Sequence, residues 1–251
     1  MKVFSVIGYT QSGKTTTIEK IIKELRKRNY TVGSVKDIHY EKFEIDTDAS
    51  NTHRHKVAGS QLVTARGFYE TDILFQEKLN IYDILKYYDY DYVVLEGVRD
   101  INAPKIITAV KEQDIEDRLD YSTFLISGKI ADRIQEYKEI KALSAMDDIE
   151  KLVDFIEENT FELLPDFDEK CCNECGYNCR KMCEMIIKGE KHRTDCKLSN
   201  DRVSVKIDGK EITMVPFVEK LVRNSVLAVV GELEGYKENS KIEIELGYGE
   251  N

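Results

Sequence analysis

A glycine-rich stretch near the N-terminus, residues 8–15 (GYTQSGKT), constrains the fold of this chain more than any other feature. It fits the pattern GxxxxGK(S/T) of the phosphate-binding loop. Residues 2–7 before it are mostly apolar and predict a strand, and residues 16–28 after it carry apolar side chains at helical spacing. Because strand, glycine loop and helix follow in that order, the stretch predicts a phosphate site rather than a chance glycine turn.

The residue types in this loop suit the binding of phosphate. Gly8 and Gly13 are expected to adopt backbone angles that side chains forbid, so that successive N–H groups turn toward phosphate oxygens. The start of the following helix adds partial positive charge. Lys14 is expected to reach the β- and γ-phosphates, and the hydroxyl of Thr15 to bind Mg²⁺.

A second local signal is the apolar strand predicted within residues 90–97 (YDYVVLEG), which ends in Glu96 and Gly97. In phosphate-loop proteins a carboxylate at this point orders Mg²⁺ or orients the attacking group. Glu96 is therefore expected to act beside Lys14 as the second catalytic residue and as the acidic Mg²⁺ partner of the loop. The alternative is an acid that only caps a turn. The polar segment 36–46 follows another predicted strand, as ligand-binding loops do in parallel sheets.

Strands and helices alternate as far as residue 164 and predict an α/β fold, a mostly parallel sheet with helices on both faces. Further strands are predicted at 30–35, 61–65, 72–75, 105–110 and 121–126, and helices at 52–59, 82–88 and 147–158. Residues 201–251 differ: they predict a hairpin around Asp208-Gly209, a short helix at 216–223, and strands at 225–230 and 241–246. The predicted parts are a nucleotide-binding domain (1–164), a cysteine-rich segment (165–200) and a small α+β unit (201–251).

All six cysteines of the chain lie between residues 171 and 196. Three are closely spaced, and a fourth follows a helix predicted at 180–188, an arrangement that suits a four-iron cluster or tetrahedral zinc. A 4Fe-4S cluster is the preferred interpretation, with structural zinc and free or disulfide-bonded cysteines as alternatives. Cys171 is an alternative to its neighbour as a ligand, and Cys183 is expected to be a buried small residue. The four expected ligands are Cys172, Cys175, Cys179 and Cys196.

Charge and hydropathy narrow the classes of partner. The net charge of −10 argues against a nucleic-acid partner, which requires basic surface. No apolar run reaches the length of a membrane span, and the N-terminus opens directly into a strand instead of a signal peptide. The protein is therefore expected to be cytoplasmic, without a membrane partner. In that compartment clustered cysteines favour metal or redox chemistry over disulfides.

With these motifs in order, residues 1–160 resemble the molybdopterin-guanine dinucleotide biosynthesis protein B family. The resemblance rests on GYTQSGKTT, on VGSVKDIHY, on FEID followed by THR and AGS, and on VVLEGVRD followed by APKI. It implies a phosphate-loop fold that binds GTP and Mg²⁺ and hydrolyses GTP slowly. It also implies a homodimer, and a role in attaching GMP to molybdopterin beside a guanylyltransferase partner.

The resemblance extends the predicted site to residues outside the loop motif. Thr16 joins the phosphate and Mg²⁺ residues, Glu96 is the strand-end acid, and Lys36 and Asp37 follow the second strand. This chain departs from the family's histidine-rich pattern at residues 37–40, and His39 is expected to be a surface side chain. The expected nucleotide-binding residues are Gly8, Tyr9, Thr10, Gln11, Ser12, Gly13, Lys14, Thr15, Thr16, Lys36 and Asp37.

The cysteine segment is similar to a small 4Fe-4S domain of redox and corrinoid proteins, with its pattern CxxCGxxxC, a helix and a distant cysteine. Here the third cysteine comes one residue early. A GTP-binding accessory protein of molybdenum or tungsten cofactor maturation, fused to such a domain, is the preferred hypothesis. A carrier that delivers molybdopterin cofactor to an enzyme, and an ATP-dependent metal or cluster assembly protein, are the alternatives. No NKxD motif selects guanine, and Arg54, Arg66 and Arg99 are candidates for an arginine finger.

Overall fold

The computed structural model describes residues 1–40, 43–165, 175–196, 203, 205–207, 210–212, 214, 216–237, 242–244 and 246–247. The chain divides into two compact units, residues 1–166 with 179–195, and residues 167–178 with 196–251. The helix α6 (Cys179–Ile187), which the sequence predicts within the cysteine-rich segment, belongs to the first unit.

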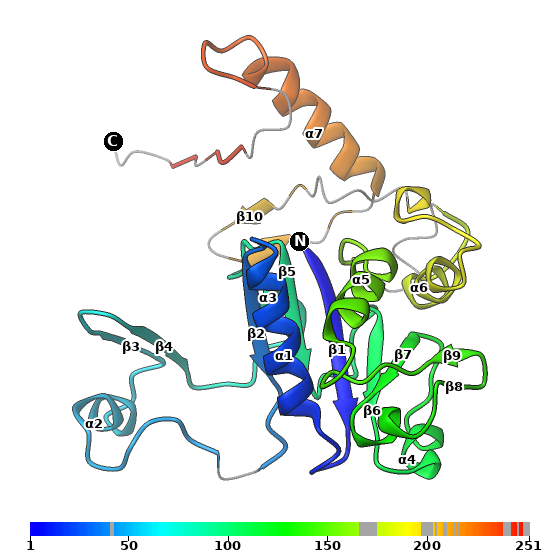
Figure 1. Ribbon diagram of the computed structural model, residues 1–251. Helices are drawn as coiled ribbons and strands as arrows, with labels where there is room; N and C mark the ends of the chain where they lie inside the picture. Colours follow the sequence, from blue (N-terminus) through cyan, green and yellow to red (C-terminus); the bar gives the residue numbers. More distant parts are fainter. Residues whose placement is uncertain are drawn as a thin grey trace. The chain divides into compact units, whose positions relative to one another are not determined.

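A five-stranded parallel sheet in the order β2-β5-β1-β6-β7 forms the centre of the first unit (Figure 1). The inner residues of its central strand are all buried, because helices cover both faces and the strand needs no polar side. The predicted α/β fold with a mostly parallel sheet is confirmed. The strands are β1 (Lys2–Gly8), β2 (Val32–Lys36), β5 (Tyr92–Glu96), β6 (Lys105–Thr108) and β7 (Thr123–Ser127).

Apolar side chains alternate between the two faces of β1. Phe4 and Val6 belong to a core cluster that includes buried residues of two helices, α1 (Lys14–Lys27) and α5 (Ile149–Asn159). Val3 faces the other way and packs in a cluster with the buried residues of α3 (Ile81–Leu85). The short helix α4 (Glu112–Glu116) follows β6, and the 3-10 helix η1 (Lys129–Asp132) follows β7.

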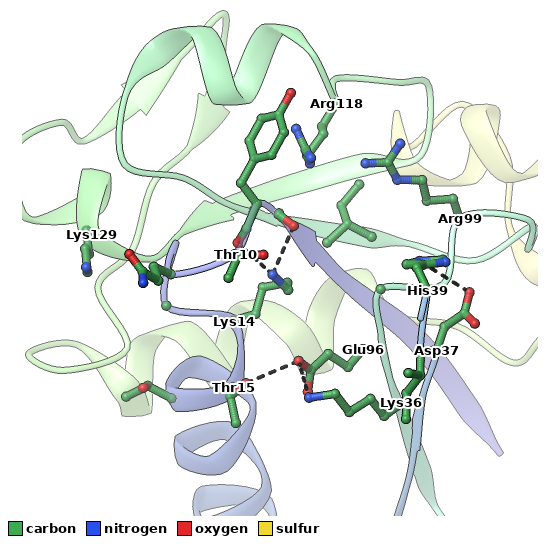
Figure 2. A pocket seen from close by; sticks show the side chains of 18 residues that line it. Thr10, Lys14, Thr15, Lys36, Asp37, His39, Glu96, Arg99, Arg118 and Lys129 are labelled. Atoms are coloured by element: carbon green, nitrogen blue, oxygen red, sulfur yellow. Dashed lines mark hydrogen bonds and ion pairs between the residues drawn. The ribbon is translucent and has the colours of Figure 1, made fainter. Parts of the chain in front are cut away.

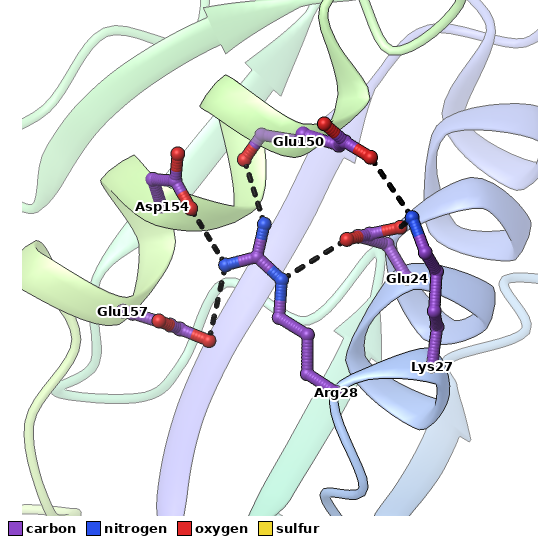
Figure 3. Close-up of polar contacts among 6 residues, drawn as sticks. All are labelled: Glu24, Lys27, Arg28, Glu150, Asp154 and Glu157. Carbon is purple, nitrogen blue, oxygen red and sulfur yellow. Dashed lines mark hydrogen bonds and ion pairs between the residues drawn. The ribbon is translucent and has the colours of Figure 1, made fainter.

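Charged side chains join α1 to α5 beside this core (Figure 3). Arg28 donates from Nε to Glu24 at 3.0 Å, from Nη1 to Asp154 at 2.7 Å, and from Nη2 to the carbonyl oxygen of Glu150 at 3.0 Å. Burial opposes the ionisation of Glu24, but hydrogen bonds from Arg28 and Lys27 outweigh it and hold the pKa of that carboxyl below its usual range. Glu24 is therefore charged at neutral pH, and the network fixes the helix that begins at the phosphate loop.

Two predicted strands lie outside the central sheet. β3 (Leu62–Arg66) and β4 (Thr71–Phe75) pair antiparallel as a separate hairpin, preceded by α2 (Asn51–Val57). The sequence predicts both strands but not their exclusion from the sheet, since strand patterns carry no information about pairing partners. The remaining elements of this unit are β8 (Glu136–Tyr137), β9 (Ile140–Lys141) and η2 (Arg193–Asp195).

In the second unit the predicted hairpin is present, while its turn at 208–209 lies outside the described residues. β10 (Val205–Ile207) pairs antiparallel with β11 (Lys210–Ile212). The strand predicted at 225–230 is wrong, because these residues continue α7 (Pro216–Val230). No breaker separates them from the preceding helix, and Ser225 donates to the carbonyl oxygen of Leu221, a helical contact. Of the strand predicted at 241–246, the described residues are not in a strand.

Within the part of the chain that the structure describes, no helix combines the length and the apolarity needed to cross a membrane.

Candidate functional site

The carboxyl ends of three parallel strands bring distant residues to one edge of the sheet. β1 runs directly into the glycine-rich loop, and its residue Val6 pairs in register with Glu96 at the end of β5. Lys36, the last residue of β2, pairs with Glu96 from the other side. The edge where the loop begins therefore also carries Lys36 and Glu96, as the crevice rule for open α/β sheets leads one to expect.

The two outer glycines of the loop are required for different reasons. Gly13 has φ +101°, a left-handed conformation that side chains rarely adopt, as the sequence argument expects. Gly8 has no such angle, so the backbone-angle argument is wrong there. A Cβ atom on Gly8 would lie 2.3 Å from the carbonyl oxygen of Thr108, and close packing against β6 is what excludes a side chain.

Lys14 folds back over the loop that it follows. Its Nζ donates to the carbonyl oxygens of Gly8 at 3.0 Å and Tyr9 at 2.7 Å. Burial lowers the pKa of Lys14, the charge of Glu96 opposes this, and the positive charges of Arg118 and Lys36 add to the lowering. The ammonium group is held where phosphate oxygens would replace its two carbonyl acceptors.

Glu96 lies beside the hydroxyl of Thr15. Its Oε1 accepts from Thr15 Oγ1 at 3.2 Å and from Lys36 Nζ at 3.2 Å (Figure 2). Its side chain is 14% exposed. A carboxylate and a hydroxyl are the hard oxygen ligands that Mg²⁺ prefers, directly or through its waters. The donor set therefore fits the ion that the sequence assigns to these two residues.

The second strand continues into this edge. The backbone N–H of Asp37 donates to the carbonyl oxygen of Glu96 at 2.9 Å. His39 Nε2 lies 3.6 Å from Asp37 Oδ2, and the imidazole is 71% exposed, so His39 is the surface side chain expected from the sequence. Both residues nevertheless line the same pocket as the loop.

The pocket at this edge has a volume of about 960 Å³. Of the nucleotide-binding residues predicted from the sequence, Ser12 alone does not line it. Ser12 is fully buried, and its hydroxyl shares a hydrogen bond with Thr108 Oγ1 at 2.8 Å, so it holds the loop against the end of β6. Among the arginine-finger candidates, Arg99 lines the pocket and Arg54 and Arg66 do not.

Two cationic residues of the pocket, Arg118 and Lys129, were missed by the sequence analysis. Neither belongs to a motif, and both are more than 100 positions from Lys14. Arg118 follows α4 and Lys129 begins η1, so each comes shortly after the carboxyl end of β6 or β7. The only signal in the sequence was their place after the strands predicted at 105–110 and 121–126, because every parallel strand ends at the same edge of the sheet.

The described cysteines do not form a ligand group by themselves. Cys175 and Cys196 belong to the second unit, while Cys179 and Cys183 belong to the first, and Cys171 and Cys172 lie outside the described residues. No three metal-binding side chains are grouped within the described ranges. Burial raises the pKa of Cys183 to about 12, so this thiol stays protonated and is the buried small residue expected.

Known proteins are similar to this chain in sequence. Residues 3–126 match the family model of molybdopterin guanine dinucleotide synthesis protein B, MobB. A Methanocaldococcus jannaschii protein, assigned as a molybdopterin-guanine dinucleotide biosynthesis adapter protein, is 32% identical over 98% of this chain and 97% of its own length. A Bacillus subtilis protein with the same assignment is 22% identical over 61% of this chain and 90% of its own length.

Solved structures agree on the fold. The crystal structure of Bacillus subtilis MobB has a TM-score of 0.53 and 20% identity, and the match covers 63% of this chain and 97% of that one. A second structure of the same protein gives a TM-score of 0.51 with 19% identity. At such identity these matches carry the architecture alone. The near-complete match to the Methanocaldococcus jannaschii protein, together with the family model, shows that this chain belongs to the MobB family.

Proposed function

We propose that the protein is an adapter of molybdopterin-guanine dinucleotide biosynthesis that binds GTP with Mg²⁺ and supports the guanylylation of molybdopterin. The observation that carries this proposal is the pocket in which Lys14 of the loop lies close to the Thr15 and Glu96 pair. Membership of the MobB family supplies the pathway, and the phosphate loop supplies the ligand class. A guanylyltransferase and molybdopterin are the partners that this role requires.

The residues of the pocket divide the work of binding a nucleotide. Loop N–H groups and the start of α1 hold phosphate oxygens, and Lys14 neutralises their charge. Thr15 and Glu96 would hold Mg²⁺, which supplies further charge neutralisation when bound. No described carboxylate other than Asp37 and Glu96 lines the pocket to act as a base. Slow hydrolysis is the activity that this arrangement supports, since catalysis rests on positioning and charge.

Replacing Glu96 by glutamine tests the metal side of the site. The substitution keeps an amide oxygen that can accept from Thr15, but it removes the negative charge that favours a cation. We expect GTP affinity in the presence of Mg²⁺ to fall about tenfold, and affinity in EDTA to change less than twofold. The lower end of the range for a charge-assisted hydrogen bond, about 1.5 kcal/mol, corresponds to about a tenfold change in affinity. Isothermal titration calorimetry with and without Mg²⁺ measures both.

Titrations with ATP beside GTP show which of the two nucleotides the site prefers. GTP bound at least tenfold more tightly than ATP supports the proposal, whereas a preference for ATP would favour the ATP-dependent assembly protein instead. Glu158→Gln is the matched control, because Glu158 is an exposed glutamate that does not line the pocket, and it should bind both nucleotides as the wild type does. An equal loss of affinity with and without Mg²⁺ in the Glu96 variant would contradict its role at the metal.

We further propose that Cys172, Cys175, Cys179 and Cys196 hold a 4Fe-4S cluster, a proposal that rests on their spacing. If so, protein purified without oxygen should be coloured and carry about four irons per chain. Cys196→Ala should lose the iron, and Cys183→Ala should retain it, because Cys183 lies outside the predicted ligand set and is a fully buried side chain of α6. A colourless wild-type protein that holds one zinc would refute the 4Fe-4S cluster and support the zinc alternative.

A further inference from the structure

The guanidinium of Arg118 stacks on the aromatic ring of Tyr9 in the phosphate loop. Its guanidinium carbon lies 3.2 Å from the ring centroid of Tyr9, the loop residue that follows Gly8. The hydroxyl of Tyr9 donates to Asp117 Oδ2 at 2.9 Å, so the segment after α4 is tied to the loop at two adjacent residues. Stacking engages the face of a guanidinium and leaves the N–H groups at its edge available.

The hydrogen-bonding capacity of Arg118 is not used within the described chain. Its Nε is buried and has no hydrogen-bond partner among the described residues. The neighbouring carboxylate of Asp117 is already engaged by Tyr9 and by Gln113. The Nε itself is out of reach of a ligand, but Arg118 is only partly buried and lines the pocket, so a ligand oxygen there would supply an acceptor for the rest of the guanidinium.

Positive charge is in excess in the pocket as a whole. Five cationic and two acidic side chains line it, in a protein whose net charge is −10. Lys36 is paired with Glu96, whereas Arg99 and Arg118 form no ion pair with a carboxylate in the described ranges. Figure 2 shows these two arginines together on the wall away from Glu96 and Lys36, with Lys14 between the two sides.

We propose that Arg118 binds a phosphate group at a second subsite of this pocket, beside the phosphates that Lys14 holds. The fork of a guanidinium matches the oxygens of a phosphate, and the Tyr9 stack orients that fork before the ligand arrives. The inference rests on the proposed nucleotide function. The phosphate is either the terminal group of the bound nucleotide or part of a second molecule bound next to it, and these two sources give different results below.

Calorimetric titrations of GTP, GDP, and inorganic phosphate into GDP-loaded protein test the subsite. If the phosphate is the terminal one, Arg118→Met weakens GTP binding at least tenfold and GDP binding less than twofold. If it belongs to a second molecule, GTP and GDP affinities are unchanged, and the GDP-loaded variant loses the phosphate binding that the wild type shows. Arg118→Lys keeps the charge without the fork, and should recover less than half of the lost binding free energy.

Arg26→Ala is the control, since Arg26 is an exposed arginine of α1 outside the pocket and should match the wild type throughout. Equal affinities of wild type and Arg118→Met in all three titrations would overturn the subsite. So would an equal loss for GTP and GDP with a lowered melting temperature, which is the signature of a purely structural clamp. A wild type that binds neither nucleotide would instead refute the proposed function, and that result is distinct from both of these.

Discussion

Lys14→Ala should lower the affinity for GTP about 100-fold. A charged hydrogen bond to phosphate is worth about 1.5–3 kcal/mol, and the upper part of this range corresponds to about two orders of magnitude in the dissociation constant. To bind a phosphate, Lys14 must give up its hydrogen bonds to the carbonyl oxygens of Gly8 and Tyr9. Because these bonds are lost on binding, the loss of GTP affinity in Lys14→Ala should not exceed this value. Calorimetry with Mg²⁺-GTP measures the effect.

Lys23→Ala is the matched control for this substitution. Lys23 is an exposed lysine of α1, the same helix that Lys14 begins, and it does not line the pocket. The control should bind GTP as the wild type does, and both variants should melt within a few degrees of it. Equal GTP affinity in Lys14→Ala and the wild type would contradict the assignment of the phosphate site to this loop.

Gly8→Ala should destabilise the folded protein by about 3 kcal/mol. The new Cβ would lie 2.3 Å from the carbonyl oxygen and 2.4 Å from the Oγ1 of Thr108. Gly8 and Thr108 are paired in register at the ends of β1 and β6, so the contact is relieved only by moving the strands apart. Overpacking of this kind costs about 1–3 kcal/mol, and the upper end applies because one of the two contacts is with backbone.

Gly13→Ala separates strain from close packing. Its φ of +101° opposes a side chain, but the nearest atom to its Cβ would be 3.5 Å away, at Gly128. We expect a loss of about 1 kcal/mol from strain alone. Urea unfolding followed by circular dichroism compares the two variants, and a Gly8→Ala protein as stable as the wild type would show that β6 gives way without cost.

Short-range patterns determined much of this protein. Residues 8–15 specify the turn from β1 to α1 because glycine, lysine and threonine act there within one loop. Alternating strands and helices determined the parallel sheet, since a parallel pair needs a crossover that a helix supplies. The position of Glu96 followed from its place at the end of an apolar strand, and the structure brings it to the hydroxyl of Thr15.

The tertiary structure decided what depends on residues far apart in the chain. The requirement for glycine at position 8 comes from Thr108 of a neighbouring strand, and the place of Arg118 comes from its contact with Tyr9. The pairing of β3 with β4 outside the central sheet is equally non-local. A sequence pattern reports the local conformation and burial of a segment, but strand order and register choose its neighbours. The loop was therefore determined by the sequence itself, and the opposite wall of its pocket by the fold.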